Sequence, residues 1–233
     1  MKPAVYISRS VLKTYFSLFN RSYEVKGQDT LPTGPKIIAM NHTPGFDPLY
    51  LPFILKETPH FLLQDGLFRI PVLGWMLKGS GQIPVLRGTA KATEAMDQAC
   101  ALLRDGGTIA IFPEGRDVPL GQHMTAKSGA VRMSLETGVP IVPLGLYAPA
   151  QSLTHLHVIW KGSPLSGAWQ FSGRSYMRFG APWNPDRALN VHAQTRELMD
   201  RIYVLVAEAE RDVSLCSIPR RIPISMAVLR RFP

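Results

Sequence analysis

Cysteine is scarce in this chain: Cys100 and Cys216 are the two cysteines among 233 residues, and no CxxC pair occurs. Two isolated cysteines exclude a disulfide framework and indicate a reducing compartment. No stretch reaches the roughly 18 to 20 uninterrupted apolar residues that a membrane-spanning helix needs. The N-terminus has no long apolar run ending in a small-residue cleavage site, so we expect no secretory signal. We therefore expect a protein that is soluble or lies on a membrane without crossing it.

Signatures of several function classes are also missing. No helix-turn-helix, zinc-finger or RNA-recognition motif occurs, which argues against nucleic acid as a partner. A serine hydrolase would need G-x-S-x-G, which is absent. Lys127-Ser128 lacks the preceding glycines of a phosphate-binding P-loop. His155-x-His157 has no nearby cysteine or acidic residue to complete a metal site. We therefore expect no metal and no bound cofactor.

What the chain does have is apolar residues and positive charge. Its hydrophobic content is 45%, enough to build the core of one large domain. The net charge is +9 and the isoelectric point is near 9.8. A basic excess of this size favours acidic partners: nucleic acid, anionic lipid, or an acidic substrate such as a phosphate or coenzyme A. Because reading motifs for nucleic acid are missing, anionic lipid and acidic substrates remain.

Short apolar runs alternate with helical patterns along the chain. Apolar runs of about 4 to 8 residues predict buried strands, and longer segments with helical spacing predict helices. The strands are expected at 36–40, 61–64, 82–86, 108–112, 140–147, 156–161 and 176–180. The helices are expected near 49–56, over 89–104, 127–137 and 186–211, with short irregular helices over 66–78. This alternation predicts an α/β fold, a single domain with a mixed, largely parallel sheet flanked by helices.

Both ends of the chain combine basic and apolar residues. Residues 3–21 show an amphipathic helical pattern with positive charge on the polar side. Such a pattern is typical of a helix on an anionic membrane, and it equally fits a surface helix packed on the domain. The basic tail 213–233 is either a second lipid contact or a frayed end. We therefore divide the chain into an N-terminal membrane-associating segment 1–24, a domain 25–212 and the tail.

The first polar cluster follows the strand predicted at 36–40 and contains Asn41, His42 and Asp47. Histidine is the usual general base near neutral pH, and a carboxylate bonded to its second nitrogen fixes the tautomer. The four residues between His42 and Asp47 can curl back so that the two side chains meet. The alternative is a surface turn in which Asp47 caps the following helix. The spacing alone leaves both interpretations open.

Two further clusters follow predicted strands. Glu114, Gly115 and Arg116 come directly after the strand 108–112, and Arg87 ends the strand 82–86. Arginine offers a planar fork of donors to phosphate, and glycine lets the backbone approach a ligand. The alternatives are a turn with a surface ion pair and a simple bend. Residues 139–145 contain no titratable side chain, so we expect them to pack or to shape a channel.

Taken in order, these segments resemble the four sequence blocks of the lysophosphatidic acid acyltransferase-like family of glycerolipid acyltransferases. The matching stretches are Asn41-His42 with Asp47, Gln82 to Arg87, Phe112 to Gly115, and Val139 to Pro143. Residues 127–130 resemble the stretch between the third and fourth blocks, and the similarity covers roughly residues 25 to 180. Two departures stand out: Pro44 replaces a frequent serine, and Arg116 follows Gly115 without the usual threonine.

The resemblance implies an O-acyltransferase whose domain is 25–212. His42 and Asp47 are then the catalytic pair, while Asn41, Arg87, Glu114, Gly115 and Arg116 bind substrate. The implied donor is acyl-CoA or acyl carrier protein, and the implied acceptor is a lysophospholipid, most often 1-acylglycerol 3-phosphate. A peripheral or monotopic position on the cytoplasmic face of a membrane follows from such substrates. Another lysophospholipid or glycolipid acceptor, or a non-catalytic lipid-binding module, remains the alternative.

Overall fold

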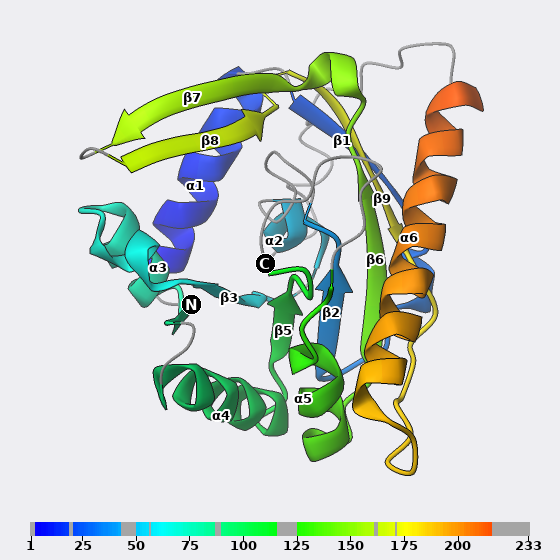
Figure 1. Ribbon diagram of the computed structural model, residues 1–233. Coiled ribbons are helices and arrows are strands. Elements are labelled where there is room, and N and C mark those ends of the chain that lie inside the picture. The colour runs from blue at the N-terminus through cyan, green and yellow to red at the C-terminus, as the bar shows by residue number, and fades with distance from the viewer. Residues whose placement is uncertain are drawn as a thin grey trace.

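The architecture is built around one seven-stranded sheet (Figure 1). The computed structural model describes residues 3–18, 21–42, 50–55, 57–86, 90–115, 125–160, 163–170 and 172–215. In spatial order the strands are β1 (Arg21–Lys26), β9 (Gly173–Phe179), β6 (Ile141–Tyr147), β2 (Lys36–Met40), β5 (Thr108–Ile111), β3 (His60–Gln64) and β4 (Ile83–Val85). The neighbours from β6 to β4 pair in parallel, whereas β9 is antiparallel to β6 and parallel to β1. The predicted mixed, largely parallel sheet is confirmed.

Helices cover both faces of this sheet. One face carries α4 (Ala90–Arg104), α5 (Gly129–Thr137) and α6 (Val191–Leu215). The other carries α1 (Pro3–Leu18) and α2 (Leu51–Ile54), with η3 (Asp65–Arg69) and α3 (Leu73–Gly79) beside α1. Alternate residues of β2 enter the two cores: Ile37 faces the α4–α6 side and Ile38 faces the α1–α2 side. Because both faces are buried, the central strands are continuous apolar runs, as the sequence suggested.

The N-terminal helix is shorter than predicted, and a strand follows it. We predicted a helix over 3–21, but α1 ends at Leu18 and β1 begins at Arg21. β1 joins the main sheet through its pairing with β9. The boundary that we drew at residue 24 therefore falls inside a strand of the domain. Phe16 ties α1 to the core, because its ring stacks on that of Tyr50 at 4.5 Å and is almost completely buried.

The last helix begins later than predicted, because two possible caps lie close together. The Asp186 carboxylate accepts a hydrogen bond from the Ala188 backbone at 2.8 Å, which closes a turn and does not start the helix. Asn190 is the cap of α6: its Oδ1 accepts hydrogen bonds from the backbones of His192 and Ala193. The helix then runs to Leu215, past the predicted end at residue 211.

A separate two-stranded hairpin lies between β6 and β9 in the chain. Its strands are β7 (Thr154–Trp160), near the strand predicted at 156–161, and β8 (Ser163–Trp169), which we did not predict because Pro164 and Gly167 disfavour strands. The hairpin extends across the top of the view in Figure 1. At its base the buried side chain of Gln170 accepts a hydrogen bond from Ser175 at 2.7 Å and donates one to Ser152 at 3.2 Å.

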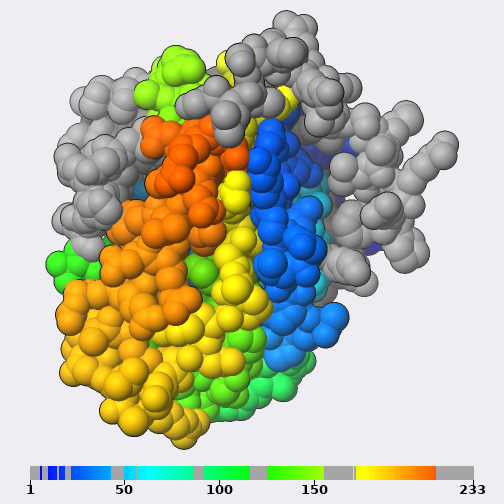
Figure 2. Space-filling model, turned by 90° about the vertical axis from the view of Figure 1, so that its right-hand side faces the viewer, coloured from blue at the N-terminus to red at the C-terminus, as the bar shows by residue number. Residues whose placement is uncertain are grey.

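α6 lies along β6 and beside β9, and Figure 2 shows it next to β9 and β1 on one surface. Gly145 allows the close approach, because a Cβ there would lie 2.5 Å from the backbone of Leu205 and Val206. Near the end of the helix, Asp212 forms ion pairs with Lys26 of β1 at 2.7 Å and with Arg178 of β9 at 2.8 Å. Close packing and charge pairing therefore both hold α6 on the sheet.

Candidate active site

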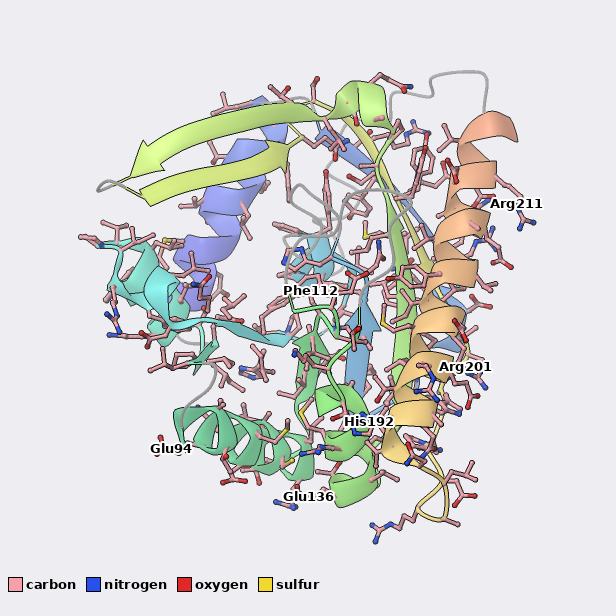
Figure 3. The ribbon with its side chains drawn as sticks, viewed as in Figure 1. Glu94, Phe112, Glu136, His192, Arg201 and Arg211 are labelled. Atoms are coloured by element: carbon pink, nitrogen blue, oxygen red, sulfur yellow. The ribbon has the colours of Figure 1, made fainter. Side chains whose placement is uncertain are left out.

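Two of the predicted polar clusters meet at the carboxyl edge of the parallel strands. Ala39 of β2 pairs with Ile111 of β5, so the two chains leave the sheet side by side. His42 follows β2, and its imidazole lies against the ring of Phe112 with centroids 4.2 Å apart. Phe112 sits at the end of β5, near the centre of the molecule (Figure 3). The edge beyond the carboxyl ends of parallel strands is where ligand sites of α/β folds form.

A tight turn follows β5 and directs the side chain of Glu114 back toward this edge. The Gly115 N–H donates to the Phe112 carbonyl at 3.0 Å, which closes a β-turn with Pro113 at its second position. Gly115 has φ 72°, a conformation that disfavours side chains, so the glycine is required here. The Lys127 N–H donates to the Pro113 carbonyl at 2.7 Å and fixes the turn against the segment that leads into α5.

The carboxylate of Glu114 is buried in this turn, with 4% of the residue exposed. One oxygen accepts a hydrogen bond from the backbone N–H of His42 at 2.5 Å. The other accepts a hydrogen bond from the hydroxyl of Tyr203 on α6 at 2.6 Å. A buried carboxylate needs donors to offset its lost hydration, and here the protein supplies them. The side chain therefore connects the loop after β2, the turn after β5 and the C-terminal helix.

Asn41 holds the other side of the histidine. Its side-chain amide donates to the Leu146 carbonyl at 2.9 Å and its side-chain oxygen accepts from the Leu146 N–H at 2.8 Å. These two hydrogen bonds extend the pairing of β2 with β6 by one residue, with the side-chain amide taking the place of a backbone amide. The residue before His42 is thereby fixed to β6, while the N–H of His42 is fixed to Glu114.

Three predicted site residues, Asp47, Arg87 and Arg116, lie outside the described residues. A contact between His42 and Asp47 therefore stays a prediction, as does phosphate binding by the two arginines. The fourth block, Val139–Pro143, leads into β6, and Ile141 and Val142 are both fully buried, in keeping with the predicted packing role. Tyr203 was missed, because it lies in a helical pattern 89 residues after Glu114 and no local motif announces it.

Exposed apolar side chains on α1, η3 and α3, where α3 contacts both of the other elements, make up what we call the apolar patch. This apolar patch consists of Tyr6, Val11, Leu18, Leu67, Val72, Leu73 and Trp75. Val72 is 71% exposed and has φ 65°, an unfavourable conformation for a β-branched residue. The exposed basic residues Lys13, Arg69 and Lys78 belong to the same three elements. Trp75 adds an exposed aromatic ring of the kind found at membrane interfaces.

The described residues lack two features that would bear on the site. None of the helices in the described ranges is both long and apolar enough to cross a bilayer. Within the same ranges, no three histidine, cysteine, aspartate or glutamate side chains gather in a way that would hold a metal ion.

Comparisons with known proteins point in one direction. The Acyltransferase family profile matches residues 22–147, more than half of the chain. A 1-acyl-sn-glycerol-3-phosphate acyltransferase of Borreliella burgdorferi is 31% identical over 141 residues, which cover 60% of this chain and 56% of that protein. A chloroplastic 1-acyl-sn-glycerol-3-phosphate acyltransferase of Brassica napus is 29% identical over 126 residues, covering 53% and 36% of the two chains. The chain thus spans between about a third and just over half of these curated relatives.

The fold has a solved counterpart. The crystal structure of the 1-acyl-sn-glycerophosphate acyltransferase of Thermotoga maritima aligns with a TM-score of 0.68 and 20% identity. The alignment covers 88% of this chain and 79% of that one, so the likeness extends beyond the segment that the family profile matches. At 20% identity the structural similarity establishes the fold alone, whereas the match to the family profile establishes family membership. The chain belongs to the acyltransferase family.

Proposed function

We propose that this protein transfers a fatty acyl group from a thioester to the sn-2 hydroxyl of 1-acylglycerol 3-phosphate, giving phosphatidate. The donor is acyl-CoA or acyl carrier protein, and the reaction takes place on the cytoplasmic surface of a membrane. The observation that carries the proposal is the fixed position of His42 at the carboxyl edge of β2 and β5, between Asn41 and Glu114. Membership in the family and the activity for which its relatives are named support the same reaction.

In this mechanism His42 is the general base. Its imidazole accepts the proton of the acceptor hydroxyl while the hydroxyl oxygen attacks the thioester carbonyl. The tetrahedral intermediate then collapses, the thiolate leaves, and the imidazolium returns the proton to it. Asp47 is proposed to hold the imidazole and to balance its developing charge. General-base catalysis of this kind contributes roughly 10² to 10⁴ in rate, and no acyl-enzyme intermediate is needed.

The predicted substrate-binding residues divide into two roles in this proposal. Glu114 and Asn41 position the base, because their polar atoms bond to His42 and Leu146 within the protein. A buried carboxylate would also repel a phosphate, which argues against Glu114 as a phosphate ligand. Gly115, Arg87 and Arg116 are then the proposed phosphate site. Holding a base in place matters, because a misplacement of about 1 Å costs about 10²-fold in rate.

The apolar patch is proposed as the lipid-facing surface. Its tryptophan and aliphatic side chains suit the boundary between acyl chains and headgroups, and the neighbouring lysines and arginine suit anionic headgroups. The patch lies on α1, η3 and α3, on the side of the sheet where the Phe112 ring that contacts His42 also packs. A lysophospholipid that enters from the bilayer would therefore reach the site from this side.

The test is a coupled assay on liposomes. Palmitoyl-CoA or palmitoyl-carrier protein is incubated with 1-acylglycerol 3-phosphate, and free thiol and phosphatidate are followed together for wild type and His42→Ala. We expect thiol release that matches phosphatidate formation and disappears in the variant. Thiol release without phosphatidate would redirect the proposal to another lysophospholipid or a glycolipid acceptor. No release with either donor would replace it by a non-catalytic lipid-binding module.

A further inference from the structure

The C-terminal helix reaches the catalytic centre through one hydroxyl group. Tyr203 of α6 donates to one oxygen of Glu114 at 2.6 Å, and the other oxygen of the same carboxylate accepts from His42 N–H at 2.5 Å. Tyr203 lies well beyond residues 22–147, the segment that the family profile matches. None of the four sequence blocks contains it. The two hydrogen bonds share a single buried carboxylate, so the orientation of Glu114 depends on both donors.

We propose that Tyr203 is a positioning residue of the acyl transfer, acting through Glu114 to fix the backbone of His42. The inference rests on the proposed function, because it takes His42 as the base. With both donors present, each oxygen of Glu114 accepts a hydrogen bond, one from His42 N–H and one from the Tyr203 hydroxyl. Without the tyrosine hydroxyl, one oxygen of a carboxylate that is 4% exposed loses its donor. Because an unsatisfied buried carboxylate oxygen is costly, the Glu114 side chain should then rotate toward other donors, and the His42 backbone bonded to it should shift as well.

The role differs from that of a simple docking contact, because α6 is held on the sheet in several other places. Gly145 lets the helix backbone pack directly on β6, and Asp212 pairs with Lys26 and Arg178. Removing a single hydroxyl group from Tyr203 should therefore leave the helix docked. The effect on catalysis can then be separated from an effect on folding, which makes Tyr203→Phe an informative variant.

The chain offers a matched control in Tyr147. This tyrosine is half-buried at the end of β6 and lies beside Glu210 of α6; burial and that carboxylate together raise the pKa of its hydroxyl. Tyr147 and Glu210 are thus a second tyrosine–glutamate pair between the sheet and α6, and Glu210 is a different carboxylate from the one that accepts from His42 N–H. Tyr147→Phe should change helix docking about as much as Tyr203→Phe does, without changing how His42 is held.

The experiment compares wild type, Tyr203→Phe and Tyr147→Phe as full chains in the liposome assay, with thermal unfolding alongside. We expect Tyr203→Phe to lower kcat by about tenfold or more, with both KM values within about twofold of wild type, since misplacement of the base acts on the chemical step. Tyr147→Phe should retain wild-type kcat. Equal losses of kcat in the two variants, or a wild-type kcat in Tyr203→Phe, would overturn the proposal.

A spectroscopic readout makes the result independent of turnover. Backbone amide signals of ¹⁵N-histidine-labelled protein report on the six histidines, and the His42 signal is assigned by its loss in His42→Ala. We expect that signal to shift or broaden in Tyr203→Phe and to stay in place in Tyr147→Phe. An unchanged His42 signal in both variants would refute the connection. If wild type transfers no acyl group, the proposed function fails, while this spectrum still decides whether Tyr203 fixes the loop.

A double-mutant cycle tests whether Tyr203 acts through Glu114. Glu114→Gln weakens the same connection, because an amide cannot accept strongly from both donors at once. If the two side chains act as a unit, the loss of kcat in Tyr203→Phe/Glu114→Gln should be clearly smaller than the product of the two single losses. Multiplicative losses would mean that Tyr203 acts by another route, and the proposal would be wrong.

Discussion

At the scale of single residues, the site depends on polar side chains that bond to backbone. Asn41 and Glu114 lie on either side of His42, the proposed base, and each connects it to a different part of the fold. Asn41 joins the end of β2 to Leu146 of β6 with both halves of its amide. Such a side chain both stabilises the fold and fixes the position of the neighbouring backbone, since the backbone groups to which it bonds are buried.

Replacing Asn41 by alanine should therefore affect both stability and turnover. The N–H and C=O of Leu146 would each lose a partner, and an unsatisfied buried group costs about 1 to 3 kcal/mol. We expect urea unfolding to report a loss of roughly 2 kcal/mol or more, together with a fall in kcat. Asn190→Ala is the control: it removes the cap of α6, which costs about 1 kcal/mol, and should leave kcat intact. If Asn41→Ala matched that control in both measurements, the structural role given to Asn41 would be wrong.

At the scale of elements, α6 depends on charge at its far end. Burial raises the pKa of Asp212, but hydrogen bonds and charge from Lys26 and Arg178 outweigh that effect and hold the pKa below its usual value. The folded-state pKa lies below the unfolded-state pKa of about 3.9. Ionised Asp212 therefore stabilises the fold fully above the unfolded-state pKa. The stabilisation is lost as the pH falls through the folded-state pKa.

This linkage predicts how Asp212→Asn differs from wild type across pH. The variant should be less stable near neutral pH, and the gap in unfolding free energy should narrow as the pH falls from about 7 to about 3. Denaturant unfolding at several pH values measures the gap. Asp105→Asn, which changes an exposed carboxylate after α4, is the control and should stay close to wild type in stability. A gap that stays constant or widens in acid would contradict the assigned role of Asp212.

Local patterns were enough to predict most elements of the fold. The continuous apolar run of β2 and the glycine after α5 depend on interactions within a few residues, and the structure confirms both, with Gly138 at φ 73°. β1 was missed because its mixed polar residues look like the end of the preceding amphipathic helix, and its pairing with β9 lies about 150 residues away. The start of α6 was misplaced because Asp186 and Asn190 are both good caps, and only packing decides between them.

The residues of the candidate site also fall into two groups: those that local motifs predict and those that depend on distant contacts. His42 and Glu114 could be identified from short motifs that follow predicted strands, and the sheet brings these two segments together. The contacts that hold them, from Leu146 and Tyr203, come from distant parts of the chain and have no motif of their own. The sequence also suggested that Glu114 faces the substrate, because a carboxylate after a strand looks like a ligand. The structure shows that this carboxylate is buried and accepts from His42 N–H after β2 and from Tyr203 of α6, contacts that no local pattern predicts.

At the scale of the whole molecule, the two sides of the sheet differ in what they expose. The α1 side carries the apolar patch, whereas on the α6 side Arg201 and Arg211 point outward from the helix (Figure 3). This difference between the two sides supports the proposed contact of the α1 side with a bilayer. Deleting α1 would be a poor test, because Phe16 belongs to the core and its loss would disturb the fold. Substitutions of exposed patch residues avoid that problem.

Two valines of similar exposure provide the comparison. Val72 of the apolar patch is 71% exposed, and Val204 on α6 is 57% exposed. Burying a valine side chain is worth about 1.5 to 3 kcal/mol, so Val72→Asp should lower the partition coefficient onto anionic liposomes at least about tenfold. It should do little harm to folding, since the Val72 side chain is largely exposed. Val204→Asp adds the same charge on the opposite side and should sediment with liposomes nearly as wild type does. Equal losses in both variants would show that added negative charge, and not the apolar patch, governs binding; equal retention would place the lipid contact elsewhere on the molecule.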